Sequence, residues 1–161
     1  MIYELLPLIV GIFWLGMSQL AQYQAEQNLP SSSITTVAQD AASEFIDYRN
    51  AVASYLAQNP GFAGSVPASG IAPFYPPGMV LPSAAGNMIT ATASGNGSII
   101  YAWSQSLPVE AAAAVQMLGG DASIGMVSGS QWISPIYGVQ NWPVPAFVPD
   151  GDILSIIQIG S

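Results

Sequence analysis

The chain contains no cysteine, no histidine and no lysine, and Arg49 is the one cationic side chain among its 161 residues. The missing cysteines exclude a disulfide framework and thiolate metal sites. Zinc centres, histidine-dependent nucleophilic triads and Schiff bases are excluded as well, because the residues they need are absent. No feature selects a pair of carboxylates for hydrolytic chemistry. We therefore predict no catalytic residue, cofactor or metal, and expect a protein that is not an enzyme.

The scarcity of positive charge also restricts the partners of this chain. Nine acidic residues against one arginine give a formal net charge of −8. Nucleic acid binding depends on lysine and arginine at the phosphates, so nucleic acid is excluded as a partner. Electrostatic docking onto an anionic lipid surface is excluded for the same reason. The apolar fraction of 51% is enough to fill a core, so the chain is predicted to fold.

An apolar run, "MIYELLPLIVGIFWLGMSQL", opens the chain and carries no charge between Leu5 and Met17. As a helix, residues 1–21 would measure about 32 Å, close to the thickness of a bilayer core. Cleavage as a secretory signal is disfavoured, because no basic residue precedes the run and glutamines surround the alanines of the candidate processing site. We predict that residues 1–28 form a transmembrane helix and its polar extension.

Three residues of this segment are candidates for a membrane or assembly role. Pro7 lies early in the helix, where the backbone groups that it frees cost least. Trp14 lies deeper than the usual interfacial belt. Glu4 is either a carboxylate at the membrane edge, near the positive end of the helix dipole, or the acidic residue by which a type IV pilin pairs with a neighbouring subunit. The pilin interpretation requires a basic leader, which the sequence does not show, or a residue 1 that is already a processed terminus.

The orientation in the membrane rests on indirect observations. Arg49 lies too far from the helix to weigh in the positive-inside rule, and about 140 residues follow the helix while only a few precede it. Long domains translocate largely regardless of charge. We therefore expect a single-pass protein of the bacterial inner membrane, with its N-terminus in the cytoplasm and the bulk of the chain in the periplasm.

The exported part is predicted to follow a linker, "LPSSS", at residues 29–33, where proline ends the first helix. Apolar residues then recur at every third or fourth position, which predicts a long amphipathic helix. This stripe comprises Ile34, Val37, Ala41, Phe45, Tyr48, Val52 and Tyr55. Pro60 and Gly61 are predicted to end the helix. We expect its apolar face to pack on a sheet, in a domain of residues 34–161.

Arg49 lies within this helix, and no Asp or Glu is three or four positions away from it. One interpretation is a solvated arginine whose stem covers apolar surface. The other is an ion pair with another element, for which Asp121, Asp150 and Asp152 are the candidates. The stretch Asp150-Gly151-Asp152 is itself interpreted as a turn, because the further ligands of a calcium loop are missing.

The rest of the chain predicts a mainly antiparallel sheet and one short helix. "NMITATASGNGSIIYAW" is typical of a hairpin that turns at residues 95–97. "PVEAAAAVQML" predicts a short helix that begins at Pro108 and is closed by a pair of glycines. A second hairpin is predicted to turn at residues 128–130, "DGDILSIIQI" predicts a C-terminal strand, and residues 62–87 predict a long loop. The predicted fold class is therefore α+β.

Aromatic side chains in loop-prone stretches are candidates for a recognition surface. They are Phe74, Tyr75, Trp132, Tyr137 and Trp142. Some of them must belong to the core, and the sequence does not sort them. A periplasmic carbohydrate- or ligand-binding module would draw on these aromatics alone.

One longer pattern carries a family resemblance. "FIDYRNAVASYLAQNPGFAGSVP", followed by "VSGSQWISPIYG" and the ending "VPAFVPDGDILSIIQI", resembles over residues 45–159 the PilM family of thin-pilus (type IVb) biogenesis proteins of conjugative plasmids, which is distinct from the actin-like protein of the same name. The resemblance implies an inner-membrane protein that faces the periplasm, belongs to the base of the pilus assembly apparatus and has no enzymatic activity. It carries over no catalytic residue. The residues that match the motif are predicted to shape the helix end and the following loop: Tyr48, Arg49, Asn50, Pro60 and Gly61.

We therefore expect a non-enzymatic, membrane-anchored scaffold or interaction module of a thin-pilus assembly apparatus. Its expected partners are other pilus-assembly proteins or pilins, and the membrane through the N-terminal helix; a second copy of the chain is a further candidate. The alternative is a minor pilin or pseudopilin, a subunit that enters the filament through its first helix. Glu4 and the Gly-, Ser- and Thr-rich head suit that alternative.

Overall fold

The computed structural model describes residues 36–160. The predicted transmembrane helix and linker, and with them Glu4, Pro7 and Trp14, lie outside the described residues. Within residues 36–160, no helix combines the length and the apolarity needed to span a bilayer. The described helices and strands belong to one structural unit, which the chain forms from Ile34 onward.

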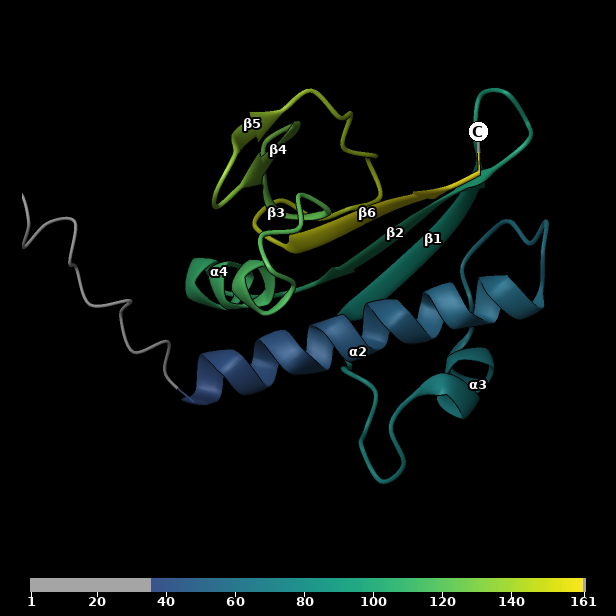
Figure 1. Cartoon of the computed structure of the whole chain (residues 1–161), viewed down its shortest axis with the longest axis horizontal. Coiled ribbons are helices and arrows are strands. Elements are labelled where there is room, and N and C mark those ends of the chain that lie inside the picture. The colour runs from purple at the N-terminus through teal and green to yellow at the C-terminus, as the bar shows by residue number, and fades with distance from the viewer. Residues whose placement is uncertain (1–35, 161) are drawn as a thin grey trace, which may run out of the picture. The chain divides into compact units, whose positions relative to one another are not determined.

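Helix α2, Thr36–Gln58, confirms the predicted amphipathic helix and runs beneath the sheet in Figure 1. Its buried face comprises Ala38, Ala42, Phe45, Ile46, Tyr48, Arg49, Ala51, Val52 and Leu56. The predicted stripe is wrong at Val37, whose side chain is 72% exposed. Ala42 packs against the alanines of α4, Pro108–Met117, because small side chains let two helices approach closely. The helix is therefore rotated from the predicted stripe at its start.

Six strands form one antiparallel sheet in the order β1-β2-β6-β3-β4-β5. They span Ala85–Ala91 (β1), Ser98–Ser104 (β2), Ile124–Ser128 (β3), Gln131–Ser134 (β4), Gly138–Gln140 (β5) and Ile153–Ile159 (β6). The α+β class, both hairpins and the C-terminal strand are confirmed. The sequence did not predict where the last strand lies: β6 inserts between the two hairpins and pairs with β2 and β3. In Figure 1, β1, β2 and β6 run side by side above α2.

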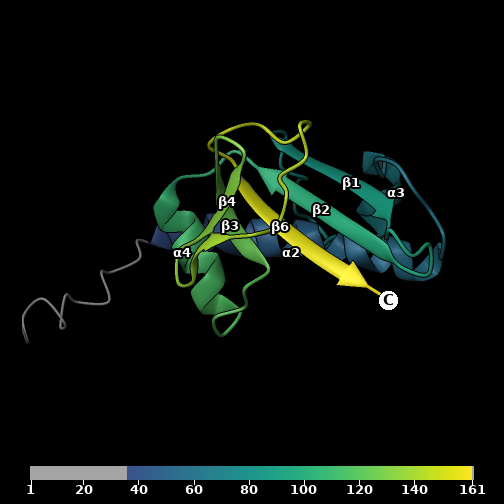
Figure 2. The ribbon, with the colours of Figure 1, turned by 90° about the horizontal axis from the view of Figure 1, so that it is seen from above.

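Helices α2 and α4 cover the same face of this sheet, as Figures 1 and 2 show. Alternate residues of the central strands point toward the helices, among them Ile100 of β2 and Ile153 of β6, which are fully buried. Each such side chain stabilises the fold by about 1.5–3 kcal/mol. Helix α4 begins at Pro108, and Glu110 Oε2 accepts a hydrogen bond from Leu107 N at 2.8 Å, which satisfies one of the free amides at the helix start.

The opposite face of the sheet is also apolar, and the segment between β5 and β6 packs on it. This cluster comprises Tyr101, Val127, Trp132, Val148, Leu154 and Ile156. A Cβ atom added to Gly86 would lie 2.4 Å from the indole of Trp103, and one on Gly125 would lie 2.5 Å from that of Trp132. Only glycine fits beneath either ring. Burial on both faces explains why β2, "SIIYAWS", is apolar almost throughout instead of alternating.

The predicted loop after α2 contains two short helical turns, α3 (Ala68–Ile71) and η1 (Ala72–Phe74), which pack on α2. Asn87 of β1, only 4% exposed, fixes this loop. Its Oδ1 accepts a hydrogen bond from Val66 N at 2.7 Å, and its Nδ2 donates to Val66 O at 3.1 Å and to Tyr48 Oη at 2.8 Å. One amide side chain thus joins the loop, the edge strand and α2.

We predict that Asn87→Ala lowers the free energy of unfolding by about 3 kcal/mol, because the buried amide and carbonyl of Val66 lose their partner. Chemical denaturation of the full chain in neutral detergent micelles, followed by tryptophan fluorescence, measures the change. Asn96→Ala, at an exposed position of the β1–β2 turn, is the matched control and should stay within about 0.5 kcal/mol of the parent chain. Equal effects of the two substitutions would contradict the role assigned to Asn87.

Candidate functional site

Arg49 is buried in the middle of the domain, with 7% of its surface exposed. Its Nη1 donates a hydrogen bond to Ser123 Oγ at 3.1 Å and lies 3.9 Å from Asp121 Oδ2. Its Nε and Nη2 donate to Asn50 Oδ1 at 3.3 and 3.0 Å. Of the three candidate partners, Asp121 is the one that pairs with Arg49. The guanidinium thereby joins α2 to the turn between α4 and β3.

The electrostatics of this group follow from its burial. Burial lowers the pKa of Arg49, and the carboxylate of Asp121 partly offsets that effect. The Asp121 side chain is 45% exposed, so the ion pair itself contributes little compared with the hydrogen bonds. Since Arg49 is the only arginine or lysine of the chain, the surface formed by residues 36–160 exposes carboxylates and no cationic side chain.

The other residues of the predicted motif take separate structural positions. Tyr48 accepts the hydrogen bond from Asn87, and burial raises the pKa of its hydroxyl against the opposing effect of that bond. Pro60 and Gly61 lie exposed just beyond the end of α2, where Gly61 has a φ of +83° that favours glycine. The structure thus brings Tyr48, Arg49 and Asn50 together on α2 but leaves Pro60 and Gly61 apart from them.

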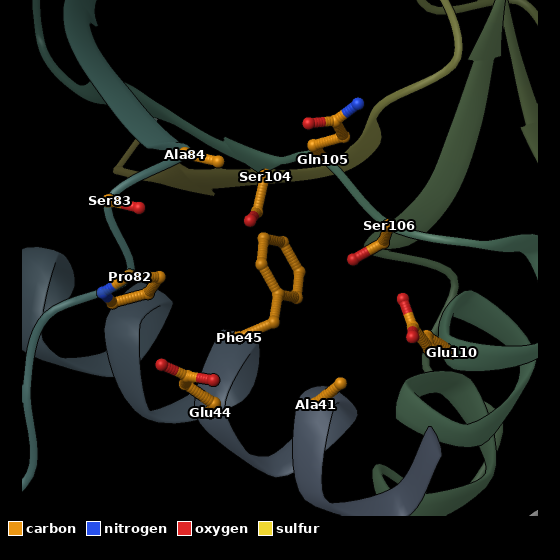
Figure 3. Close-up of a pocket in the computed structure, with 10 residues that line it drawn as sticks. All are labelled: Ala41, Glu44, Phe45, Pro82, Ser83, Ala84, Ser104, Gln105, Ser106 and Glu110. Atoms are coloured by element: carbon orange, nitrogen blue, oxygen red, sulfur yellow. The ribbon is translucent and has the colours of Figure 1, made fainter. Parts of the chain in front are cut away.

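A hollow of 320 Å³ opens between α2, the segment before β1 and the end of β2 (Figure 3). Its apolar lining is formed by Ala41, Phe45 and Pro82, and its polar lining by Glu44, Ser104 and Glu110. In Figure 3 the ring of Phe45 and the hydroxyl of Ser104 both point into this space, and the two glutamates flank it from α2 and α4.

A second hollow of 440 Å³ shares Gln105, Ser106 and Glu110 with the first. Asp150 and Asp152 complete its acidic wall. Asp150 Oδ1 already accepts a hydrogen bond from Gly129 N. The two hollows, named here the acidic hollows, therefore adjoin one another and bring together acids from α2, α4 and the turn before β6.

Two polar side chains of the acidic hollows are buried without a partner. Ser104 is 8% exposed and Asp152 is 7% exposed, and neither side chain makes a hydrogen bond within residues 36–160. Burial raises the pKa of Asp152 above its ordinary value. The polar atoms of both side chains still reach the space of the hollows, unlike the fully buried hydroxyl of Ser155, and can accept hydrogen bonds from a ligand there.

The candidate aromatic surface is largely dispersed by folding. Trp132 and Tyr75 are buried, and Phe74 and Trp142 are half-buried. Tyr137 is 54% exposed, and its hydroxyl donates to Gly120 O at 2.8 Å. Ile136, just before it, and Val139 of β5 are equally exposed. The sequence missed the acidic hollows, because their residues are far apart along the chain and no local pattern connects them.

We predict that Arg49→Ala lowers the free energy of unfolding by about 2–3 kcal/mol, since the hydrogen bonds to Ser123 and Asn50 and the packing of the buried stem are lost. Asp121→Asn should cost less than about 1 kcal/mol, because the ion pair is long and half exposed. Denaturation of both variants under identical conditions measures the two effects. A loss for Asp121→Asn as large as that for Arg49→Ala would show that the ion pair dominates instead.

We also predict that Asp152→Asn raises the free energy of unfolding at pH 7. The folded-state pKa of this acid is raised above the ordinary value of 3.8, so the ionised carboxylate is disfavoured in the folded state at every pH above that raised value. The advantage of the variant should therefore shrink as the pH falls through the raised pKa toward 3.8. Denaturation curves from pH 7 to pH 3.5 test this, with the exposed Asp40→Asn as the matched control. A stability difference that does not change with pH would refute it.

Comparisons with known proteins agree with this fold. The family model described as PilM matches residues 10–156. A crystal structure of a protein assigned as PilM from Escherichia coli B7A aligns with a TM-score of 0.56 at 19% sequence identity, over 81% of this chain and 98% of that chain, which shows that the two share a fold. A search of curated proteins found no match. The family match covers most of the chain, and the chain therefore belongs to the PilM family of thin-pilus biogenesis proteins.

Proposed function

We propose that the chain is a non-enzymatic, membrane-anchored scaffold of the thin-pilus assembly apparatus, whose head, residues 34–161, binds other assembly proteins in the periplasm. The observation that carries this proposal is the extent of the family match, from residue 10 to residue 156. It includes most of the apolar opening segment together with nearly the whole head. The match therefore treats part of the apolar segment and the head as one family pattern, which supports a head that works at a membrane.

The surface of the head supports a binding role. Ile136 and Tyr137, just before β5, and Val139 within it are each 54% exposed. Strand β5 has a pairing partner on one edge only. Interfaces between proteins that associate and separate combine apolar contacts with a polar rim. The acidic hollows add shape and negative charge at another part of the head. The chain has no histidine, cysteine or lysine, and this lack of common catalytic side chains also favours recognition over catalysis.

We predict that the full chain, produced in cells that assemble the thin pilus, sediments with the inner membrane and resists extraction by alkaline carbonate. External protease should degrade the head only after the outer membrane has been opened, because the head faces the periplasm. Immunoblots with a C-terminal tag and with a cytoplasmic marker measure both properties. A head that stays protected in intact spheroplasts would contradict the proposed orientation.

Two other outcomes would replace the proposal. Recovery as a freely soluble protein that lacks its first residues would remove the anchor. Recovery in sheared filaments, with a methylated N-terminal residue, would instead identify a minor pilin, in which Glu4 has the subunit-pairing role described above.

A further inference from the structure

The acidic hollows have the composition of a receptor for a cationic side chain. The first hollow offers the ring of Phe45 and the ring of Pro82 as apolar walls. Glu44 and Glu110 lie on either side of those walls, and the hydroxyl of Ser104 points into the same space (Figure 3). Lysine and arginine bury an aliphatic stem against apolar surface while the charged end stays with polar groups. The apolar walls could therefore contact the aliphatic stem of such a side chain, and the acids could contact its charged end.

The unpartnered groups Ser104 and Asp152 are a second and independent observation. Each is more than nine-tenths buried, each lines one of the adjoining hollows, and each lacks a hydrogen-bond partner within residues 36–160. Both can accept a hydrogen bond. An ammonium group has three donors and a guanidinium has five, so either cation can satisfy acceptors that lie in different directions.

We infer that the acidic hollows bind a lysine- or arginine-bearing segment of a partner protein. This inference rests on the proposed function, in which the head meets other pilus-assembly proteins. The charge of the head supports it: residues 34–161 hold seven of the nine acidic residues, and their one cationic side chain is buried. The head therefore attracts positively charged segments and repels acidic ones. Among residues 36–160, no three acidic side chains converge closely enough to hold a metal ion, whereas the donors of an organic cation reach acceptors that are spread apart.

The exposed apolar residues at the start of α4 suggest what flanks the cation. Leu107 lines the second hollow and is 63% exposed, and Val109 is 42% exposed. A segment whose basic residue is bordered by apolar residues would cover them while its cation enters the hollow. The inferred partner segment is therefore short, neutral or basic overall, and mixed apolar and cationic.

The test uses the full chain, labelled with ¹⁵N in zwitterionic detergent micelles, and capped pentapeptides of the form Gly-Leu-X-Leu-Gly. X is lysine, arginine, norleucine or glutamate, so that the side chain X carries the only charge. We predict that the lysine or arginine peptide shifts the amide signals of Gln105, Ser106 and Glu110, and that the norleucine and glutamate peptides do not. Raising the salt concentration should weaken the binding, because exposed charges are screened.

Three variants decide which groups are responsible. Glu44→Gln and Asp152→Asn should each weaken the binding about two- to fivefold, as expected for partly exposed charge pairs. Asp40→Asn removes the same charge at an exposed position that lines neither hollow and should leave the affinity unchanged. Glu44 is only half-buried, so its replacement keeps the test valid even if Asp152→Asn alters the fold. Equal binding of the norleucine peptide, an equal effect of Asp40→Asn, or stronger shifts of the same amides by calcium alone would each overturn the inference.

A crosslinking experiment in cells connects this site to the assembly. A photoreactive residue at Gln105, which is exposed and lines both hollows, should form an adduct on a segment of another protein that contains lysine or arginine. Glu44→Gln should reduce that adduct, and the same probe at Ser94 in the β1–β2 turn should not form it. An adduct on a segment without a basic residue would refute the inferred partner. The peptide titration does not depend on where the protein resides, so a failure of the proposed membrane location leaves its outcome unaffected.

Discussion

The packing of a single helix, α2, across the antiparallel sheet is the interaction on which the rest of the structure depends. The first half of its buried face, including Phe45 and Ile46, meets α4 and the start of β6. The second half, including Val52 and Leu56, meets β1, β2 and the turns of the following loop. Two core clusters therefore meet along one helix. Each cluster would lose one wall if α2 moved.

The middle of α2 also anchors two other segments of the chain through Tyr48 and Arg49, which lie where the two clusters meet. Tyr48 reaches Asn87 and, through it, the backbone of Val66. Arg49 reaches Ser123 in the turn before β3. Adjacent residues of one helix thereby fix two segments that are distant in sequence. This arrangement gives each residue of the Tyr-Arg-Asn stretch its own structural role. Tyr48 binds Asn87, Arg49 binds Ser123, and Asn50 holds the guanidinium of Arg49.

Much of the fold could be predicted because its helices and hairpins depend on local patterns in the sequence. The period of the apolar residues predicted α2, and the glycines at residues 95–97 and 128–130 predicted the two hairpins, since only a few residue types suit such turns. The order of the strands could not be predicted in the same way. The placement of β6 between the hairpins depends on which faces each strand buries, and Leu154 and Ile153 are fully buried on opposite faces. Such a strand belongs in the centre of a sheet, but the sequence does not say between which neighbours.

The candidate site was less accessible to sequence reasoning than the fold. Ser104 lies 60 positions after Glu44 and 48 positions before Asp152, and each is an ordinary residue in its own segment. Tyr75 and Trp132 attracted attention as aromatic residues in loop-prone stretches, yet folding buries them. Tyr75 donates to Glu44 O at 3.4 Å, and burial together with Glu44 and Asp47 raises the pKa of its hydroxyl to about 12. Tyr75 is therefore a core residue. The candidate site is formed instead by the acidic residues that line the two hollows.

The buried polar groups also show why a missing partner is not by itself a sign of binding. Ser155 is fully buried on the helix-facing side of β6, and its hydroxyl has no hydrogen-bond partner within the described part of the chain. It lines neither of the acidic hollows, so no ligand there could reach it. The polar atoms of Ser104 and Asp152 differ from that hydroxyl, because they keep access to an open space bordered by carboxylates. For Ser155 the desolvation cost is offset by the packing of the core. At Ser104 and Asp152, a donor that enters the hollows can take the place of water as the hydrogen-bond partner.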